Sequence, residues 1–444
     1  MQFRSSPFAG GAVLCAALSM LGAGAAQAQA QRDPSAPAAS TPAQPIASQT
    51  ESYRHFERLS DALDAAERLA RAAEIAGARS QAVQARLDAT DAFFAGAPTV
   101  GFDYRRDTPA FVPQLERLDP RGRNEYDYGI SAPIWLPGER ALRRQVLSVE
   151  REQTHTLRAA ERLALAGSLR ERVWALRRAQ IELDWAQRRR EDALRLEADV
   201  ARRVEAGEVA RADLLIARNE TFTAAAAHVE AQAAWRRAGA RLLELTGSPL
   251  LPGEYREEVP AAGSATDVSD DPRVRLASLE LERAQAAASL ASGVRRDNPR
   301  VTVSLRNERD ESGADYRNSI QFGISIPLDT EARNAPRLAE AVRAVASAQA
   351  RVEEQTRSVL AQRQAAQADL EAADRRIELA GQRLAAADEG LQLGERAYAL
   401  GERSLVELLR LRGIERDARL ELDSARTGRD AARAALKQSM GLMP

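Results

Sequence analysis

Few residues of this sequence have the types and spacing that a chemical site requires. The three histidines, His55, His155 and His228, stand far apart, and none has a Cys, Asp or Glu neighbour at a spacing typical of a metal site. The sequence has no P-loop, no glycine-rich dinucleotide fingerprint and no nucleophile elbow. We therefore expect neither an enzyme nor a resident metal or cofactor.

Two acidic residues stand at equivalent positions after glycines. Asp213 lies six residues after Gly207, Glu407 lies six residues after Gly401, and two leucines follow each acid. Glycine permits a turn between a long and a short helix. The acids either stabilise the first turn of a helix, by about 0.3–1 kcal/mol each, or line a narrow mouth and favour cations. The two interpretations are compatible, and both stay open.

The composition indicates long helices. Hydrophobic residues make up 44 % of the 444 residues, aromatic residues only 5 % and charged residues 29 %. The formal net charge is −1, without a long run of one sign, which argues against a nucleic-acid partner.

The N-terminal segment predicts secretion. Arg4 is followed by an apolar stretch from Ala12 to Leu21 and by two small-x-small cleavage sites, so we expect a signal peptide over residues 1–30 and a disordered Pro/Ala-rich leader over 31–58. Cys15, the single cysteine, falls inside the signal. A mature chain without cysteine suits the Gram-negative periplasm or outer membrane.

The rest of the sequence is an internal repeat. Gly129 to Pro133 matches Gly323 to Pro327, Val204 to Gly207 matches Tyr398 to Gly401, and Leu242 to Gly247 matches Leu436 to Gly441, each pair offset by 194 positions. We expect a first repeat at 59–247, a linker at 248–270 and a second repeat at 271–441. Each repeat reads helix, strand, loop, strand, very long helix, break and helix, and the first of these helices is predicted over residues 59–94.

The predicted strands alternate between apolar and polar residues, with apolar side chains on one face and small or charged side chains on the other. The residues expected on the lipid-facing side are Val100, Phe102, Tyr128, Ile130, Val303, Phe322 and Ile324. The residues expected on the lumen-facing side are Asp103, Asp127, Thr302 and Gln321. Alternation alone also fits two hairpins half-buried in a soluble core, but nothing in the sequence looks like a cover for the apolar faces. Four strands in lipid cannot keep open edges, so several chains must share one closed barrel.

The long helices carry seven-residue repeats. Between Arg333 and Tyr398 one stripe runs through Val345, Val352, Val359, Ala366, Ala373, Ala380 and Ala387. About 65 residues of helix span on the order of 100 Å at 1.5 Å per residue. Periodicity does not distinguish a hollow cylinder from a solid coiled-coil rod.

These features together resemble the TolC family of outer-membrane efflux proteins. The resemblance rests on the twofold repeat, the Gly-Ile-Ser-x-Pro strand ends at 129 and 323, and the turns at 207 and 401; the segments at 129–140 and 334–340 are similar to the CzcC-like heavy-metal branch. The resemblance implies a mostly helical fold with a transmembrane β portion, in which a homotrimer forms a twelve-stranded β-barrel continued by a long α-helical periplasmic barrel. It also implies that Glu407 belongs to an acidic ring at a periplasmic constriction.

The function that this resemblance implies is passive transport. The chain would be the outer-membrane channel of a tripartite efflux system for divalent heavy-metal cations, with outer-membrane lipid around it. A periplasmic adaptor and an inner-membrane pump of the resistance-nodulation-division type would be its partners. Drug efflux and type I secretion are alternatives within this class. A structural periplasmic coiled-coil protein is the alternative from another class, but it would not need two alternating hairpins at equivalent positions of the repeat.

Overall fold

The computed structural model describes residues 53–106, 123–259, 267–310, 314–328 and 331–444. The predicted signal peptide, and the predicted leader as far as residue 52, lie outside the described residues. The elements are α1 (Leu59–Leu69), α2 (Ala72–Ala89), β1 (Thr99–Arg106), β2 (Asn124–Pro133), α3 (Glu139–Glu205), α4 (Arg211–Thr246), the short 3-10 helix η1 (Val268–Asp270), α5 (Pro272–Gly293), β3 (Arg300–Arg309), β4 (Arg317–Ser325), α6 (Glu331–Ala399) and α7 (Leu405–Ser439).

The fold is mostly helical with one small sheet, as the sequence predicts. α3 and α6 are 67 and 69 residues long, and residues with strong helix propensity such as Ala, Leu, Glu and Arg dominate both. The single helix predicted over 59–94 is wrong. Arg71 adopts a left-handed conformation with φ of 51° and separates α1, whose apolar face is buried, from α2, where only Val83 is buried. The break lets α1 insert into the core while α2 lies along α3.

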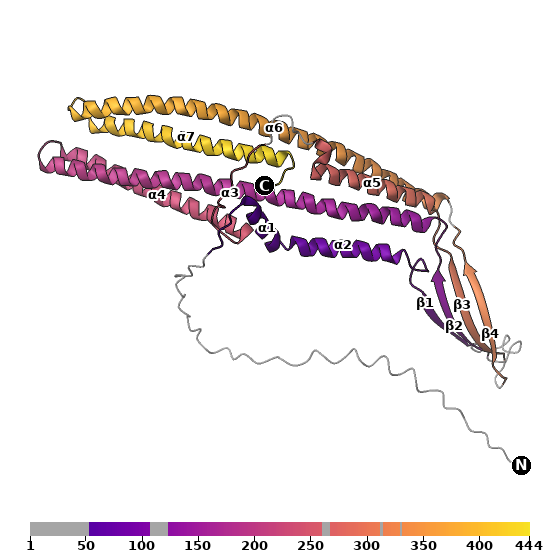
Figure 1. Cartoon of the computed structure of the whole chain (residues 1–444). Helices are drawn as coiled ribbons and strands as arrows, with labels where there is room; N and C mark the ends of the chain where they lie inside the picture. The colour runs from indigo at the N-terminus through magenta and orange to yellow at the C-terminus, as the bar shows by residue number, and fades with distance from the viewer. Residues whose placement is uncertain (1–52, 107–122, 260–266, 311–313, 329–330) are drawn as a thin grey trace, which may run out of the picture. The chain divides into compact units, whose positions relative to one another are not determined.

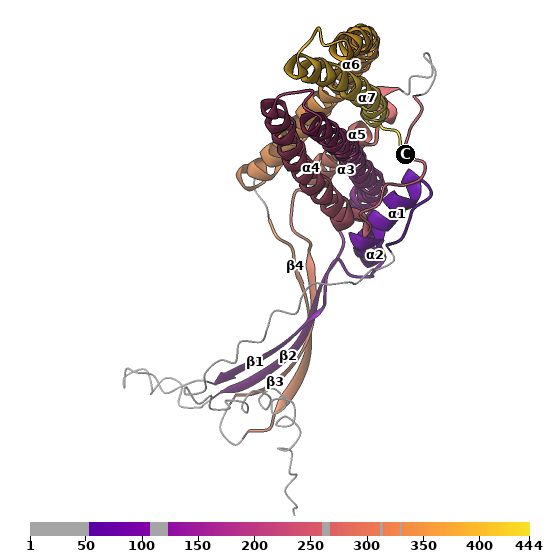
Figure 2. The same ribbon diagram turned by 90° about the vertical axis from the view of Figure 1, so that its left-hand side faces the viewer.

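The long helices form two antiparallel hairpins that lie side by side. α3 packs on α4, α6 packs on α7, and α3 also packs on α7, so the order across the helices is α4, α3, α7, α6 (Figure 1). The view in Figure 2 shows the same two pairs nearly end on, with the sheet leading away from them. Among the described residues, no helix is both long and apolar enough to cross a membrane.

Small residues allow the helices of the second hairpin to approach closely. From Val359 onward the residues buried along α6 recur every seven positions: Val359, Ala366, Ala373, Ala380, Ala387 and Gly394; Ala348 is also buried but lies outside this spacing. This stripe coincides with the repeat predicted from the sequence from Val359 to Ala387, whereas Val345 and Val352 are only partly buried. A seven-residue spacing keeps one seam of a helix against its neighbour, as in a coiled coil.

The main core lies where α1 meets the middle of α3 and the end of α4. It contains Phe56, Leu63, Leu169, Val173 and Leu242, all at most 5 % exposed.

A buried ion pair borders this core. Arg170 donates two hydrogen bonds of 2.7 Å to the carboxylate of Glu257, and the Lys437 ammonium lies 3.1 Å from the same carboxylate. Arg170 also donates to the carbonyl of Leu442 at 3.0 Å. These contacts hold the C-terminal segment against α3.

The four strands form one antiparallel sheet in the order β1-β2-β3-β4. A fully buried carboxylate fixes the junction between this sheet and the helices. Glu139, the first residue of α3, accepts hydrogen bonds from the Leu136 amide at 3.1 Å and from the Asn298 side-chain amide at 2.6 Å, and it pairs with Arg143 at 2.8 Å. Glu139 follows β2 and Asn298 precedes β3, so their hydrogen bond connects the two halves of the sequence where one leaves the sheet and the other enters it.

Candidate functional site: a two-faced sheet and two helical turns

One face of the sheet is apolar and exposed. Residues directly opposite each other on neighbouring strands point to the same face. The register places Val100 opposite Ile130, Phe102 opposite Tyr128, Val303 between Ile130 and Phe322, and Ile324 opposite Val301. The seven residues predicted to be lipid-facing therefore share one face, and their exposed fractions run from 42 to 81 %. A contiguous apolar surface of this kind marks contact with a membrane or another protein.

The other face is polar and carries ion pairs. Asp103 lies opposite Asp127, Thr302 opposite Gly323 and Gln321 opposite Ser304, so the four residues predicted to face the lumen lie together on this face.

Arginines balance the carboxylates of β2. Arg306 contacts the carboxylates of Asp127 and Glu125, each at 2.8 Å, and Arg105 approaches Glu125 at 3.4 Å. On the polar face, ion pairs therefore connect β1 to β2 and β2 to β3. Such a charged face suits contact with water.

The two helical hairpins end in turns of the same geometry. Gly207 and Gly401 have φ of 76° and 75°, a conformation that side chains disfavour. The Gly207 amide donates to the carbonyl of Val204, and the Gly401 amide donates to that of Tyr398, both at 3.0 Å. Left-handed glycines with such hydrogen bonds terminate α-helices. Both predicted glycine turns therefore exist, and their backbones match.

Asp213 and Glu407 lie in the first turns of α4 and α7. The Glu407 amide donates to the Ser404 hydroxyl and the Ser404 amide donates to the Glu407 carboxylate, both at 3.3 Å, which forms a capping box. Glu407 is exposed and Asp213 is half-buried. Glu407 thus has a helix-end role, while its exposed position beside the turn also suits a ring of charge.

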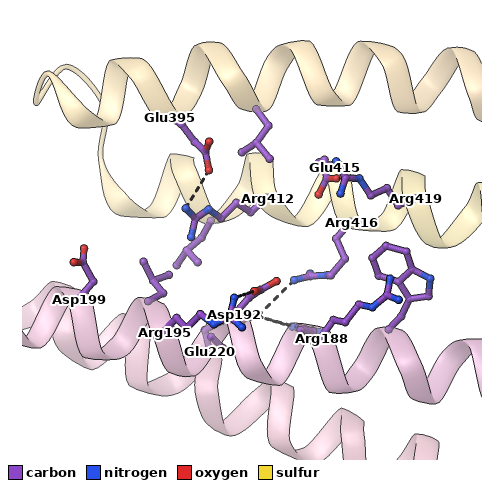
Figure 3. A pocket seen from close by; sticks show the side chains of 16 residues that line it. Arg188, Asp192, Arg195, Asp199, Glu220, Glu395, Arg412, Glu415, Arg416 and Arg419 are labelled. Atoms are coloured by element: carbon purple, nitrogen blue, oxygen red, sulfur yellow. Dashed lines mark hydrogen bonds and ion pairs between the residues drawn. The ribbon is translucent and has the colours of Figure 1, made fainter.

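A pocket of about 610 Å³ lies between the two hairpins, on the parts of the helices that lead to the turns (Figure 3). Arginines and acids of both hairpins line it. Within one hairpin Arg412 donates to Glu395 at 3.0 Å, and within the other Arg189 donates to Glu220 at 2.9 Å. Arg416 of α7 reaches Glu220 of α4 at 4.0 Å and links the hairpins. Because the opposite charges pair with each other, the pocket behaves as a charged seam between the hairpins and not as a binding site for one ion.

Burial perturbs two groups of this seam. Desolvation raises the pKa of the Glu415 carboxyl, and nearby Asp388 raises it further although Arg419 pairs with it. Desolvation and the neighbouring Arg189 lower the pKa of Arg416. Both shifts have burial as their largest cause, because a charged group loses hydration in this seam.

Contacts between the two hairpins, of α3 with α7 and of α3 with Tyr398 near the end of α6, escaped the sequence reasoning. The Trp185 indole donates to Asp423 at 3.1 Å, and the Arg203 guanidinium lies 5.6 Å from the centre of the Tyr398 ring. A signal existed for the first contact, since Trp185 and Asp423 each lie 22 residues from the glycine of their own turn. Repeat symmetry alone did not indicate that α3 and α7 would be neighbours.

Metal ligands do not cluster in the part of the chain that the structure describes. No group of three or more His, Cys, Asp or Glu side chains there is arranged to hold a metal ion.

Comparison with known proteins gives one family match. The family model "Outer membrane efflux protein" matches residues 268–442, which span α5 to α7 and the strands between them. No curated protein sequence is similar enough to the chain to count as a match.

Several solved structures share the fold over nearly the whole chain. CusC, described in terms of its folding and transmembrane channel formation, has a TM-score of 0.71 at 18 % identity and covers 92 % of this chain and 99 % of its own. A membrane protein from Pseudomonas aeruginosa has a TM-score of 0.69 at 18 % identity, covering 91 % and 99 %. The MtrE outer membrane channel of Neisseria gonorrhoeae has a TM-score of 0.67 at 19 % identity, covering 88 % and 90 %. The family match covers 268–442, and the solved structures show that the whole described chain has the fold of these outer-membrane channels.

Proposed function

We propose that the chain is the outer-membrane channel of a tripartite efflux system and conducts divalent heavy-metal cations from the periplasm to the exterior. The observation that carries the channel is the two-faced sheet. Its apolar face is exposed at Val100 and Phe322 by 81 and 80 %, while its other face carries the Arg306 ion pairs. Lipid is the natural neighbour of the first face and water of the second.

The proposed assembly is a homotrimer. β1 and β4 are the edge strands of the described sheet, and an edge in lipid leaves backbone amides and carbonyls without partners. Three chains of four strands close a barrel of twelve. We propose the repeat boundaries 59–247 and 271–441, with a linker between them, as the units that each chain contributes.

Selection of cations is proposed at the helical turns. Three copies of Asp213 and Glu407 around one mouth bring up to six carboxylates together, and rings of acidic side chains favour cations. The resemblance of residues 129–140 and 334–340 to the heavy-metal branch supports metal ions as the cargo. A periplasmic adaptor and an inner-membrane pump of the resistance-nodulation-division type would supply the energy and complete the pathway.

Three measurements test the proposal. The mass of the detergent-extracted mature chain should be that of a trimer, and planar bilayers containing it should show steps of conductance with a preference for cations. A strain lacking the gene should become sensitive to Zn²⁺, Cd²⁺ or Co²⁺, and the wild-type gene should restore resistance. A monomer without β signal would refute the channel.

The same strain separates the possible cargoes. Unchanged metal sensitivity together with new sensitivity to hydrophobic drugs would assign drug efflux instead. Loss of a secreted protein from the medium would assign type I secretion.

A further inference from the structure

The exposed face of the sheet changes in character along the strands, which lead away from the helices (Figure 2). The rows of opposed residues nearer the helices are apolar, and two polar rows follow them at the far end. The first polar row contains Tyr104, Tyr126, Asn307 and Asn318. In the last row Arg106 lies opposite Asn124, and Asn124 lies opposite Arg309. The apolar face therefore ends in aromatic and then basic side chains.

Ring contacts place Arg309 on this same face. The Tyr104 and Tyr126 rings stack with their centres 4.9 Å apart, and the Tyr126 ring lies 6.2 Å from the Tyr316 ring. The Arg309 guanidinium lies 5.2 Å from the centre of the Tyr316 ring. Tyrosines gather where the tails of membrane lipids meet the headgroups. A guanidinium beside them is therefore at the level of headgroups.

The depth of the last row fits this boundary. Val301 in an apolar row and Arg309 in the last row are eight residues apart on β3. At ~3.4 Å per residue and a strand tilt of ~40°, they differ by roughly 20 Å in depth. The apolar band of an outer-membrane barrel is about 25 Å tall. With the helices in the periplasm, as in the proposed channel, Arg309 lies near the outer boundary of this band.

The arginines of the two faces differ in their ion pairs. At the same end of the sheet, Arg306 and Arg317 on the polar face each contact two carboxylates, and Arg105 contacts one. Within the part of the chain that the structure describes, no carboxylate pairs with Arg106 or Arg309. The Arg309 Nε is shielded from water and lacks a hydrogen-bond acceptor among those residues. The last row thus carries positive charge that the described residues do not neutralise.

The two arginines are spaced for a ligand with two anionic groups. Arg106 on β1 and Arg309 on β3 are separated by β2, so their backbones lie roughly 10 Å apart. A guanidinium binds phosphate oxygens through two parallel hydrogen bonds. In the proposed barrel every copy presents one such pair, so the pairs recur around the outer rim.

The outer leaflet of a Gram-negative outer membrane presents phosphate in lipopolysaccharide, whose lipid anchor carries phosphates at the two ends of a disaccharide. We propose that Arg106 and Arg309 bind these two phosphates on the outside of the barrel. The tyrosine row then lies against the sugars, and the apolar rows lie against the acyl chains. This site rests on the proposed channel, because the apolar face must be in lipid and the helices in the periplasm.

Titration of the purified mature trimer with defined lipids tests the proposal. The trimer is held in an uncharged detergent, and native mass spectrometry counts the lipids that each trimer binds. The lipids are bisphosphorylated lipid A, lipid A without its phosphates, and phosphatidylglycerol. Arg106→Gln with Arg309→Gln is the test variant. Arg105→Gln with Arg317→Gln is the matched control, because it removes two arginines from the same end of the same strand pairs on the polar face.

The wild type should bind bisphosphorylated lipid A in preference to the other two lipids. The test variant should bind it roughly tenfold more weakly or less, because charge-assisted hydrogen bonds to phosphate are lost, and the control variant should retain the affinity of the wild type. Equal affinities of both variants would overturn the site. Equal binding of phosphatidylglycerol and lipid A by the wild type would assign the arginines to anionic phospholipid and overturn the choice of lipopolysaccharide.

The lipid comparison on the wild type needs no variant, so it decides the matter even where the test variant does not assemble. A wild-type trimer that binds lipid A equally with and without phosphates would overturn the site and leave the channel proposal standing. A monomeric native mass of the wild type would overturn both proposals.

Discussion

A pair of adjacent substitutions distinguishes a sheet in lipid from a sheet in a soluble core. Phe322 and Gln321 are neighbours on β4 that point to opposite faces: Phe322 lies opposite Val303 on the apolar face and Gln321 lies opposite Ser304 on the polar face. Phe322→Arg and Gln321→Arg introduce the same side chain at the same depth. Only the face differs, so each variant serves as the control for the other.

The expected magnitudes follow from the register. An arginine on the lipid face near the middle of a bilayer costs about 2–4 kcal/mol per chain, or roughly 6–12 kcal/mol for three chains. Ile324 lies one row nearer the helices, and two residues of a strand tilted by about 40° span roughly 5 Å of depth. Ile324→Arg, on the same face, should likewise cost more than Gln321→Arg. Gln321→Arg meets water and should change the unfolding free energy by about 0.5 kcal/mol or less per chain.

Folding into lipid vesicles during a guanidinium titration measures these differences, with the heat-modifiable band on gels reporting the folded fraction. Phe322→Arg and Ile324→Arg on the apolar face should each lose more stability than Gln321→Arg on the polar face. Equal losses for Phe322→Arg and Gln321→Arg would refute the assignment of the two faces. A larger loss at Gln321 would indicate that the charged face is the buried one.

Three further perturbations concern the helices and the segment that packs on them. Asp213→Asn with Glu407→Gln should reduce cation preference in planar bilayers at low salt, and the difference should shrink as salt rises; unaltered selectivity would leave these acids only a helix-end role. Acidification should increase the stability of the wild type through protonation of Glu415, and Glu415→Gln should abolish this increase. Since burial raises the pKa of Glu415, the folded chain binds this proton more tightly, and stability rises as pH falls through the raised pKa toward the ordinary value of about 4.3. Melting temperatures between pH 7 and 4 compare the variant with wild type, and parallel curves would contradict the cause. Glu257→Ala leaves Arg170 charged and buried and should lower the unfolding free energy by about 3–5 kcal/mol in denaturant titrations, whereas the isosteric Glu257→Gln should cost less.

Local patterns predicted much of the fold because each needs only neighbours in sequence. Alternation along β4 assigned Phe322 and Gln321 to different faces, since successive strand residues point in opposite directions. The seven-residue stripe through Ala366 and Ala373 identified the buried seam of α6. The left-handed break at Arg71 was missed, because no glycine or proline marks it and only the insertion of α1 into the core requires it.

The sequence by itself determined the helical and strand periods, the faces of the strands and the two glycine turns, all of which follow from residue size, polarity and backbone freedom. The tertiary structure alone decided which helices are neighbours. It placed Trp185 of α3 against Asp423 of α7 and brought the charges around Glu415 and Arg416 into one seam. A repeat fixes the geometry inside each hairpin. Which helix of one hairpin packs against the other hairpin depends on the apolar area buried by many residues together, and no single sequence motif contains that information.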